Sequence, residues 1–106
     1  MTAEELQRQV ELLIRQVAHW EAPRWAARAG TGDVSRAELM HALVQRLADR
    51  AAGAEGEPHR RVPRLDNDLV LPDQLRVLTA DLVAAHPPPP VLATSAADVV
   101  ETRRAL

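Results

Sequence analysis

Apolar residues recur at helical intervals along the first twenty positions of the chain. Their spacing alternates between four and three, which places them within about 120° of one another around a helix. The residues on this stripe are Leu6, Val10, Leu13, Ile14, Val17 and Trp20. Thr2 followed by Glu5 forms a capping box, so we predict a helix that starts directly after Thr2. Leu12 points away from the stripe, either as a single exposed residue or as part of a second contact.

Pro23 interrupts this pattern. A straight helix would carry Glu21 into the apolar stripe, and the ring of Pro23 clashes with the preceding turn. We therefore predict that the first helix is kinked or broken near Pro23. A short helical segment from Pro23 to Ala29 should follow and end at Gly30.

A second main helix is predicted over about 36–52. Ser35 and Glu38 form another capping box, and Gly53 is the expected stop. Its apolar face consists of Leu39, Met40, Leu43, Val44 and Leu47. Residues 53–71 then form a long connecting loop, which is uncommon inside a compact domain. The second half of this loop is rich in Val and Leu, so we expect it to pack across the bundle as extended chain.

The third main helix, predicted over about 72–86, is apolar on two sides. One side holds Leu71, Leu75, Leu78, Leu82 and Ala85, and the opposite side holds Val77, Ala80 and Ala84. A helix that is apolar on two sides is expected to be buried on two sides, so we place it at the centre of the fold.

A Pro-rich connection over 87–94 leads to the last helix. Pro87 to Pro90 should hold the chain in polyproline II. Ser95 and Asp98 resemble a capping box, so the last helix is predicted over about 96–105.

These elements predict an all-α fold, a small irregular four-helix domain that covers residues 1–106. The long connection over 53–71 argues against a strict up-and-down bundle. A chain of 106 residues can bury one hydrophobic core without a metal or a disulfide.

Charge and cysteine content narrow the classes of function. All 13 basic residues are Arg, and they face 15 acidic residues for a formal net charge of -2. This balance argues against extensive binding to nucleic acid or to an anionic membrane. Cysteine is absent, which excludes thiolate catalysis and disulfides. No apolar run approaches the roughly 18 residues of a membrane span, so we expect a cytosolic protein.

No pattern of catalytic or metal-binding residues is recognisable. The four histidines are never three or four residues apart, so they cannot pair on one helix face as zinc ligands do. Ser35 and Ser95 are the only serines, and both are better explained as helix caps. We therefore expect no enzyme, no metal and no cofactor.

The stretch HWEAPRW holds the only two Trp residues, in a chain without Phe or Tyr. Trp is enriched at the centres of protein interfaces. Trp20 is expected to complete the core stripe. For Trp25, which lies between Arg24 and Arg28, a core role and a stacked Arg–Trp surface patch are both open.

The sequence thus predicts a non-enzymatic, helical protein-interaction or regulatory module that self-associates, as a homodimer or another homo-oligomer. The apolar seam of the first helix and the additional Leu12 motivate this prediction. The predicted partner-binding residues are Trp25, Arg24, Arg28, Trp20 and Leu12.

Two alternatives remain open. One is a small-molecule-binding protein or minor enzyme with an inter-helical pocket lined by Trp20, Trp25, Met40 and His41. The other is nucleic-acid contact through Arg60, Arg61 and Arg64, which belong to a basic cluster in the long loop.

Overall fold

Five α-helices and one short 3-10 helix make up the computed structural model, which describes residues 2–30 and 32–106. The elements are α1 (Ala3–Val17), α2 (Ala22–Ala26), α3 (Arg36–Glu55), η1 (Asp68–Val70), α4 (Leu71–Ala84) and α5 (Pro89–Ala105). No β-strand occurs over these residues, so the predicted all-α class is confirmed. None of the described helices is both long and apolar enough to span a bilayer.

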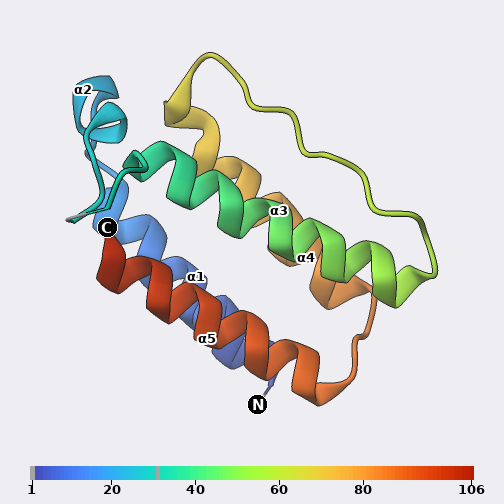
Figure 1. The fold of residues 1–106 in the computed structure, drawn as a ribbon. Helices are drawn as coiled ribbons and strands as arrows, with labels where there is room; N and C mark the ends of the chain where they lie inside the picture. Colours follow the sequence, from blue (N-terminus) through green and yellow to red (C-terminus); the bar gives the residue numbers. More distant parts are fainter. Residues whose placement is uncertain (1, 31) are drawn as a thin grey trace.

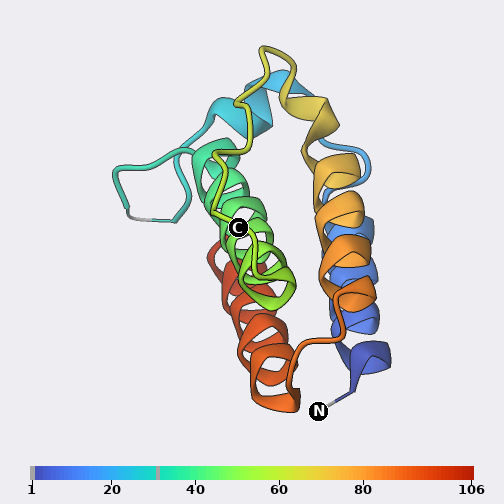
Figure 2. The same ribbon diagram turned by 90° about the vertical axis from the view of Figure 1, so that its right-hand side faces the viewer.

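The four long helices pack side by side into a bundle with two parallel pairs (Figures 1 and 2). α1 and α5 run in one direction, and α3 and α4 run in the other. The most extensive contacts are between α3 and α4 and between α1 and α5, and contacts of α1 with α4 and of α3 with α5 close the bundle. Because α3 and α4 are parallel, the chain must return along the bundle between them. Residues 57–67, which we call the strap, make this return, and the predicted irregular connectivity is confirmed.

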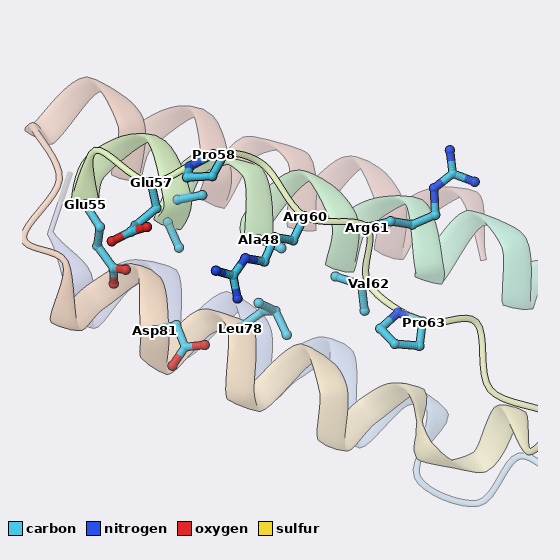
Figure 3. A pocket seen from close by; sticks show the side chains of 12 residues that line it. Ala48, Glu55, Glu57, Pro58, Arg60, Arg61, Val62, Pro63, Leu78 and Asp81 are labelled. Atoms are coloured by element: carbon cyan, nitrogen blue, oxygen red, sulfur yellow. The ribbon is translucent and has the colours of Figure 1, made fainter.

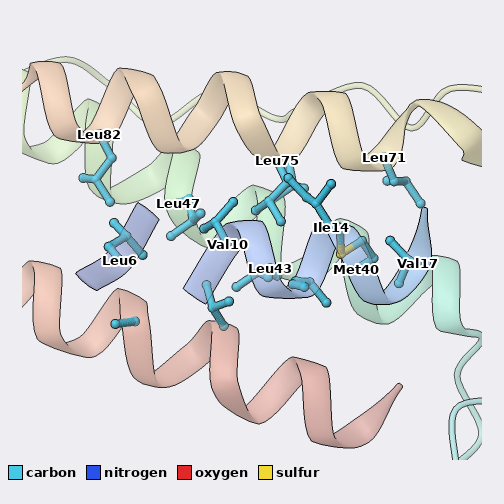
Figure 4. Packing of buried hydrophobic residues seen from close by; sticks show 14 of the residues in the cluster. Leu6, Val10, Ile14, Val17, Met40, Leu43, Leu47, Leu71, Leu75 and Leu82 are labelled. Atoms are coloured by element: carbon cyan, nitrogen blue, oxygen red, sulfur yellow. The ribbon is translucent and has the colours of Figure 1, made fainter. Parts of the chain in front are cut away.

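A single hydrophobic cluster fills the space between the helices (Figure 4). Its large members with almost no exposed surface are Trp25, Leu6, Leu13, Met40, Leu43, Leu47, Leu71, Leu75, Leu82, Val17, Val44 and Val99. Burial of each such aliphatic side chain is worth roughly 1.5–3 kcal/mol. The predicted stripe of the first helix lies in this cluster from Leu6 to Val17.

The start of α1 and its cap by Thr2 follow the prediction, whereas the Glu5 side chain does not reach back to Thr2 as in a complete capping box. The hydroxyl of Thr2 accepts a hydrogen bond from the N–H of Glu5 at 3.2 Å. The Glu5 carboxylate turns forward and accepts hydrogen bonds from Arg8 at 2.6 Å and from Gln9 at 3.1 Å. The hydrogen bond from Arg8 lowers the pKa of Glu5 to about 2.

The predicted break near Pro23 is also confirmed. α1 ends at Val17, and Pro23 lies in the first turn of α2. Amides in the first turn have no acceptor within the helix, so the missing N–H of Pro23 does not remove a hydrogen bond. α2 ends at Ala26, short of the predicted Ala29. The reason is that the N–H of Arg36 donates to the carbonyl of Ala27 at 2.9 Å, while Ala27 is extended with ψ 154°.

α3 continues past its predicted end. Gly53 lies inside the helix, and Gly56 with φ 72° provides the left-handed cap instead. The N–H of Glu57 donates to the carbonyl of Ala52 at 2.8 Å, which closes the last turn. The prediction of a stop at Gly53 was wrong, because one Gly inside a helix is destabilising by only about 1 kcal/mol.

α4 is buried on one side, so its predicted central position was wrong. Leu71, Leu75, Thr79 and Leu82 face the core. On the opposite side Val77 is 57 % exposed, and Ala80 and Ala84 are exposed as well. Four helices around one core each turn a single side inward, which leaves the second apolar side of α4 without a covering element.

The polyproline connection predicted over 87–94 does not extend beyond Pro88. α5 begins at Pro89, with two Pro residues in its first turn. Pro is well suited to this place because the first turn of a helix needs no amide donors and its φ is already helical.

Ser95 consequently lies inside α5, and its predicted role as a helix cap was wrong. Its side chain is fully buried, donates to the carbonyl of Val91 at 2.8 Å, and accepts from Arg50 at 3.1 Å. Arg50 also pairs with Asp98 at 2.5 Å. The Ser95–Asp98 pattern therefore serves the contact between α3 and α5.

Candidate functional site

The two Trp side chains meet at the end of the bundle where α1 gives way to α2. Their ring centroids are 5.0 Å apart, and the rings are inclined at 66° in an edge-on arrangement. Trp25 is 1 % exposed, whereas Trp20 is half-buried and packs against the core from outside. The prediction that Trp20 completes the core stripe was wrong. α1 ends at Val17, so Trp20 leaves the register of the stripe and Trp25 takes the core position.

Two guanidinium groups lie over the ring of Trp20. Arg24 Cζ is 5.2 Å and Arg36 Cζ is 5.5 Å from the ring centroid, which is within the range of cation–π contacts. The Arg–Trp stack considered for Trp25 is thus formed by Trp20. Arg36 is fixed in place because it donates to the carbonyl oxygens of Leu106 at 3.2 Å and Arg24 at 3.3 Å.

Arg28 lies beside this cluster through its backbone. It pairs with Ser35 in an isolated antiparallel bridge, next to Arg36, and its side chain is exposed. We call Trp20, Trp25, Arg24, Arg28 and Arg36 together the Trp20 corner. Over the part of the chain that the structure describes, none of these three Arg residues forms an ion pair with an Asp or Glu side chain.

Four of the five corner residues were among the partner-binding residues predicted from the sequence, and Arg36 was not. Arg36 is twelve positions from Arg24, and no local periodicity joins them. Leu12 does not belong to the corner. It is half-buried in α1, more than one turn before the end of that helix.

The strap is fixed to α3 by polar side chains that recur every four residues. Gln45 donates to the carbonyl of Arg60 at 2.9 Å and accepts from the N–H of Val62 at 2.7 Å. His41 Nε2 donates to the carbonyl of Val62 at 3.0 Å. Asp49, one turn further along α3, accepts a second hydrogen bond from Gln45 at 2.9 Å. The spacing of these three polar residues was visible in the sequence, but the element they bind was not.

The expected packing of the strap is only partly realised. Val62 is half-buried against the core cluster, Val70 is half-buried, and Leu71 is buried. Leu65 and Leu69 remain 47 % and 49 % exposed, so the prediction that they pack across the bundle was wrong. The hydrogen bonds from α3 end at Val62, and the chain beyond it curves away toward η1.

A hollow of about 520 Å³ lies between the strap, α3 and α4 (Figure 3). Glu55, Glu57 and Asp81 are among the residues that line one end of it, and they do not converge on a common point. Arg60 points toward α4, whereas Arg61 points away from the hollow.

The basic cluster of the strap therefore does not form one cationic surface. Arg60 and Arg61 point in different directions, and Arg64 forms an ion pair with Asp68. Nucleic-acid contact through these residues stays an untested prediction, and the geometry adds no support to it.

The residues of the predicted small-molecule pocket are not brought to one accessible place. Trp25 and Met40 are enclosed in the core, so they cannot line a space that solvent reaches. His41 lies under the strap, bound to Val62. Within residues 2–30 and 32–106, no three His, Asp or Glu side chains gather as metal ligands would.

The chain was compared with models of protein families, with curated proteins and with solved structures. None of them matches.

Proposed function

We propose that the chain is a non-enzymatic protein-interaction module that binds an acidic segment of a partner protein at the Trp20 corner. The observation that supports this most directly is the half-buried Trp20 ring beneath the guanidinium groups of Arg24 and Arg36, of which Arg24 has no described ion pair or side-chain hydrogen bond. The cytosolic location expected from the sequence belongs to the same proposal.

The corner is already ordered before a partner arrives. Trp20 rests edge-on against the buried Trp25, and Arg36 is held by two backbone carbonyls. A partner therefore loses little affinity to the ordering of these side chains. Trp and Arg are also the residue types that contribute most often to the energetic centres of interfaces.

Arg24 is the residue most able to receive a carboxylate. Its side chain is exposed, and its guanidinium lies over Trp20 with no described hydrogen bond to another residue. An arginine can bind a carboxylate through two parallel hydrogen bonds, which are about twice as strong as bonds between neutral groups. An apolar residue next to that carboxylate would contact the Trp20 ring.

A protein partner fits this surface better than a nucleic acid does. The corner has only three Arg residues, and the chain as a whole has a formal net charge of -2. Phosphate backbones are usually bound by a broad basic surface, and their affinity depends steeply on salt.

The two Trp residues are the only strong fluorophores, so their emission reports on this corner directly. The test is a fluorescence titration with a short peptide that alternates leucine and glutamate, beside a counterpart with glutamine. We expect only the glutamate peptide to change the emission of the wild-type protein. Arg24→Gln should weaken its binding about tenfold, the effect of one lost charge-assisted bond.

Arg61→Gln is the matched control, because Arg61 is also an exposed arginine without a described ion pair. It should bind the glutamate peptide like the wild type. Equal responses to both peptides, or equal losses in both variants, would refute the proposal.

Affinity capture from the native organism extends the test to the natural partner. Arg24→Glu and Arg61→Glu are suitable baits, whereas Trp25→Ala is not, because Trp25 belongs to the core. A protein retained by Arg61→Glu and lost from Arg24→Glu identifies the partner. Substitution of its contacting carboxylate by lysine should restore capture by Arg24→Glu.

A further inference from the structure

The outer side of α4 is an apolar helix face that no part of the described chain covers. Asp73, Val77, Ala80 and Ala84 lie on it, opposite the residues that face the core. Val77 is the most exposed large hydrophobic residue among those described, at 57 %. All four residues are exposed, and their spacing of four, three and four keeps them in one line along the helix.

This spacing is that of the a and d positions of a two-stranded coiled coil. Val77 and Ala84 occupy a positions, and Asp73 and Ala80 occupy d positions. A β-branched residue at position a favours pairs of helices over larger assemblies. The small side chains of Ala80 and Ala84 would let a second helix approach closely.

The charged residues on either side of this line indicate that the partner helix is α4 of a second copy of the chain. Arg76 occupies position g and Asp81 the following position e, so they lie on the two flanks of the face. In a parallel pair, position g of one helix faces position e five residues later on the other. Arg76 of each copy would therefore meet Asp81 of the other copy, twice by symmetry.

Asp81 is free for such a pair, whereas Arg76 already pairs with Glu11 and Asp73 and would have to share its guanidinium with a further carboxylate. Asp81 is exposed and has no described ion pair. Arg76 is half exposed and binds Glu11 at 3.3 Å, and a guanidinium has five donors with which to bind a further carboxylate. In an antiparallel pair, position g of one helix would face position g of the other, and position e would face position e. Arg76 and Asp81 would then not meet.

We infer that a second copy of this chain packs on the outer face of α4, with the two α4 helices parallel and Val77 at the centre of the contact. This contact is separate from the Trp20 corner. It also differs from the self-association predicted from the seam of the first helix, because that seam is buried in the core.

The dimer should be weak. α4 has 14 residues, so the contact is smaller than the roughly 1,200–2,000 Å² of a standard interface. Asp73 would also face its own copy across the seam, which opposes association. We expect a dissociation constant on the order of 100 μM. Asp73→Leu removes the repulsion and should lower this constant at least tenfold.

The first experiment is sedimentation equilibrium from 10 μM to 1 mM. The wild type should approach dimer mass at the upper end, and Val77→Asp should stay monomeric. Leu69→Asp is the matched control, because Leu69 is exposed to a similar degree on η1, and it should behave like the wild type. Monomer mass for both the wild type and Asp73→Leu over the whole range would overturn the inference. An equal loss of dimer in Leu69→Asp would do the same.

The second experiment decides the orientation. The chain has no cysteine, so Ala84→Cys introduces a single thiol. In the parallel pair the two thiols lie side by side and should form a disulfide dimer under mild oxidation. In an antiparallel pair centred between Val77 and Ala80 they would lie about 16 Å apart along the axis. A failure of Ala84→Cys to cross-link, when Val77→Cys does cross-link, would refute the parallel arrangement.

Reversal of the charges of Arg76 and Asp81 tests whether these two residues pair between the copies. Asp81→Arg should weaken the dimer at least tenfold, and the double variant with Arg76→Asp should restore most of the loss. Far-ultraviolet circular dichroism checks that each variant stays folded. Peptide binding at the Trp20 corner should be unaffected in Val77→Asp, so failure here and failure of the proposed function are distinguishable.

Discussion

Two apolar stripes with nearly the same spacing have opposite surroundings in this molecule. The stripe of α1, from Leu6 to Val17, is buried in the core cluster between α4 and α5, whereas the outer stripe of α4 around Val77 faces solvent. Both repeat at intervals of four and three. The difference teaches that periodicity identifies a face of a helix, while the rest of the fold decides whether something covers that face.

The largest expected effect concerns the residue that covers the end of the α1 stripe. Trp25→Ala should lower the free energy of unfolding by about 3–5 kcal/mol, because it leaves a cavity in the core. Trp20→Ala should lower it by less, since that ring is half-buried. Chemical denaturation followed by far-ultraviolet circular dichroism measures both. Equal losses would mean that the two rings share the core position.

Within the α1 stripe itself, Leu13→Ala should lower the free energy of unfolding by about 2–5 kcal/mol. Leu13 has no exposed surface and is a member of the core cluster. Denaturation of the variant beside the wild type measures the loss. A loss below about 1 kcal/mol would contradict the buried state of this stripe.

The strap differs from the α1 stripe because hydrogen bonds from α3 hold it in place. Gln45→Ala removes the donor to the Arg60 carbonyl and the acceptor of the Val62 N–H. We expect a loss of about 1–3 kcal/mol, because a partly buried amide loses its partner. Amide hydrogen exchange should be faster at Val62 and unchanged in the centre of α1. Unchanged exchange at Val62 would show that the strap is held by other contacts.

On the exposed stripe, Val77→Ala should change the stability of the monomer by no more than about 0.5 kcal/mol. The measurement must be made at low micromolar concentration, where self-association does not contribute. A loss comparable to that of Leu13→Ala would mean that this face is covered in the monomer.

The smallest effect is expected on the solvent side of α1. The pKa of Glu5 in the folded chain is lowered to about 2 by the hydrogen bond from Arg8, so it lies below its value of about 4.3 in an unfolded chain. The hydrogen bond between Arg8 and the ionised Glu5 therefore stabilises the folded chain at pH values above the unfolded pKa. This stabilisation is lost as the pH falls toward 2. Titration followed by carboxyl carbon NMR should give a midpoint near 2 for the wild type. Arg8→Gln should raise that midpoint, and an unchanged midpoint would exclude Arg8 as the cause.

The local features of this protein could be predicted from neighbouring residues alone. The cap at Thr2, the cap at Ser35, the break before Pro23 and the buried side of α1 all follow from the sequence. Each depends on hydrogen bonds or sterics within about one turn of the chain, or on a repeat along one helix, so neighbouring residues suffice to specify it.

Which of these faces meet depends on the packing of the whole fold. This packing placed Trp25 inside and Trp20 outside, left one side of α4 exposed, and gave Ser95 a partner on α3. It also set Arg36 over Trp20 and bound the strap to Gln45. These outcomes depend on contacts between segments far apart along the chain. Such contacts have no period in the sequence, because they form only when several helices compete for the same core.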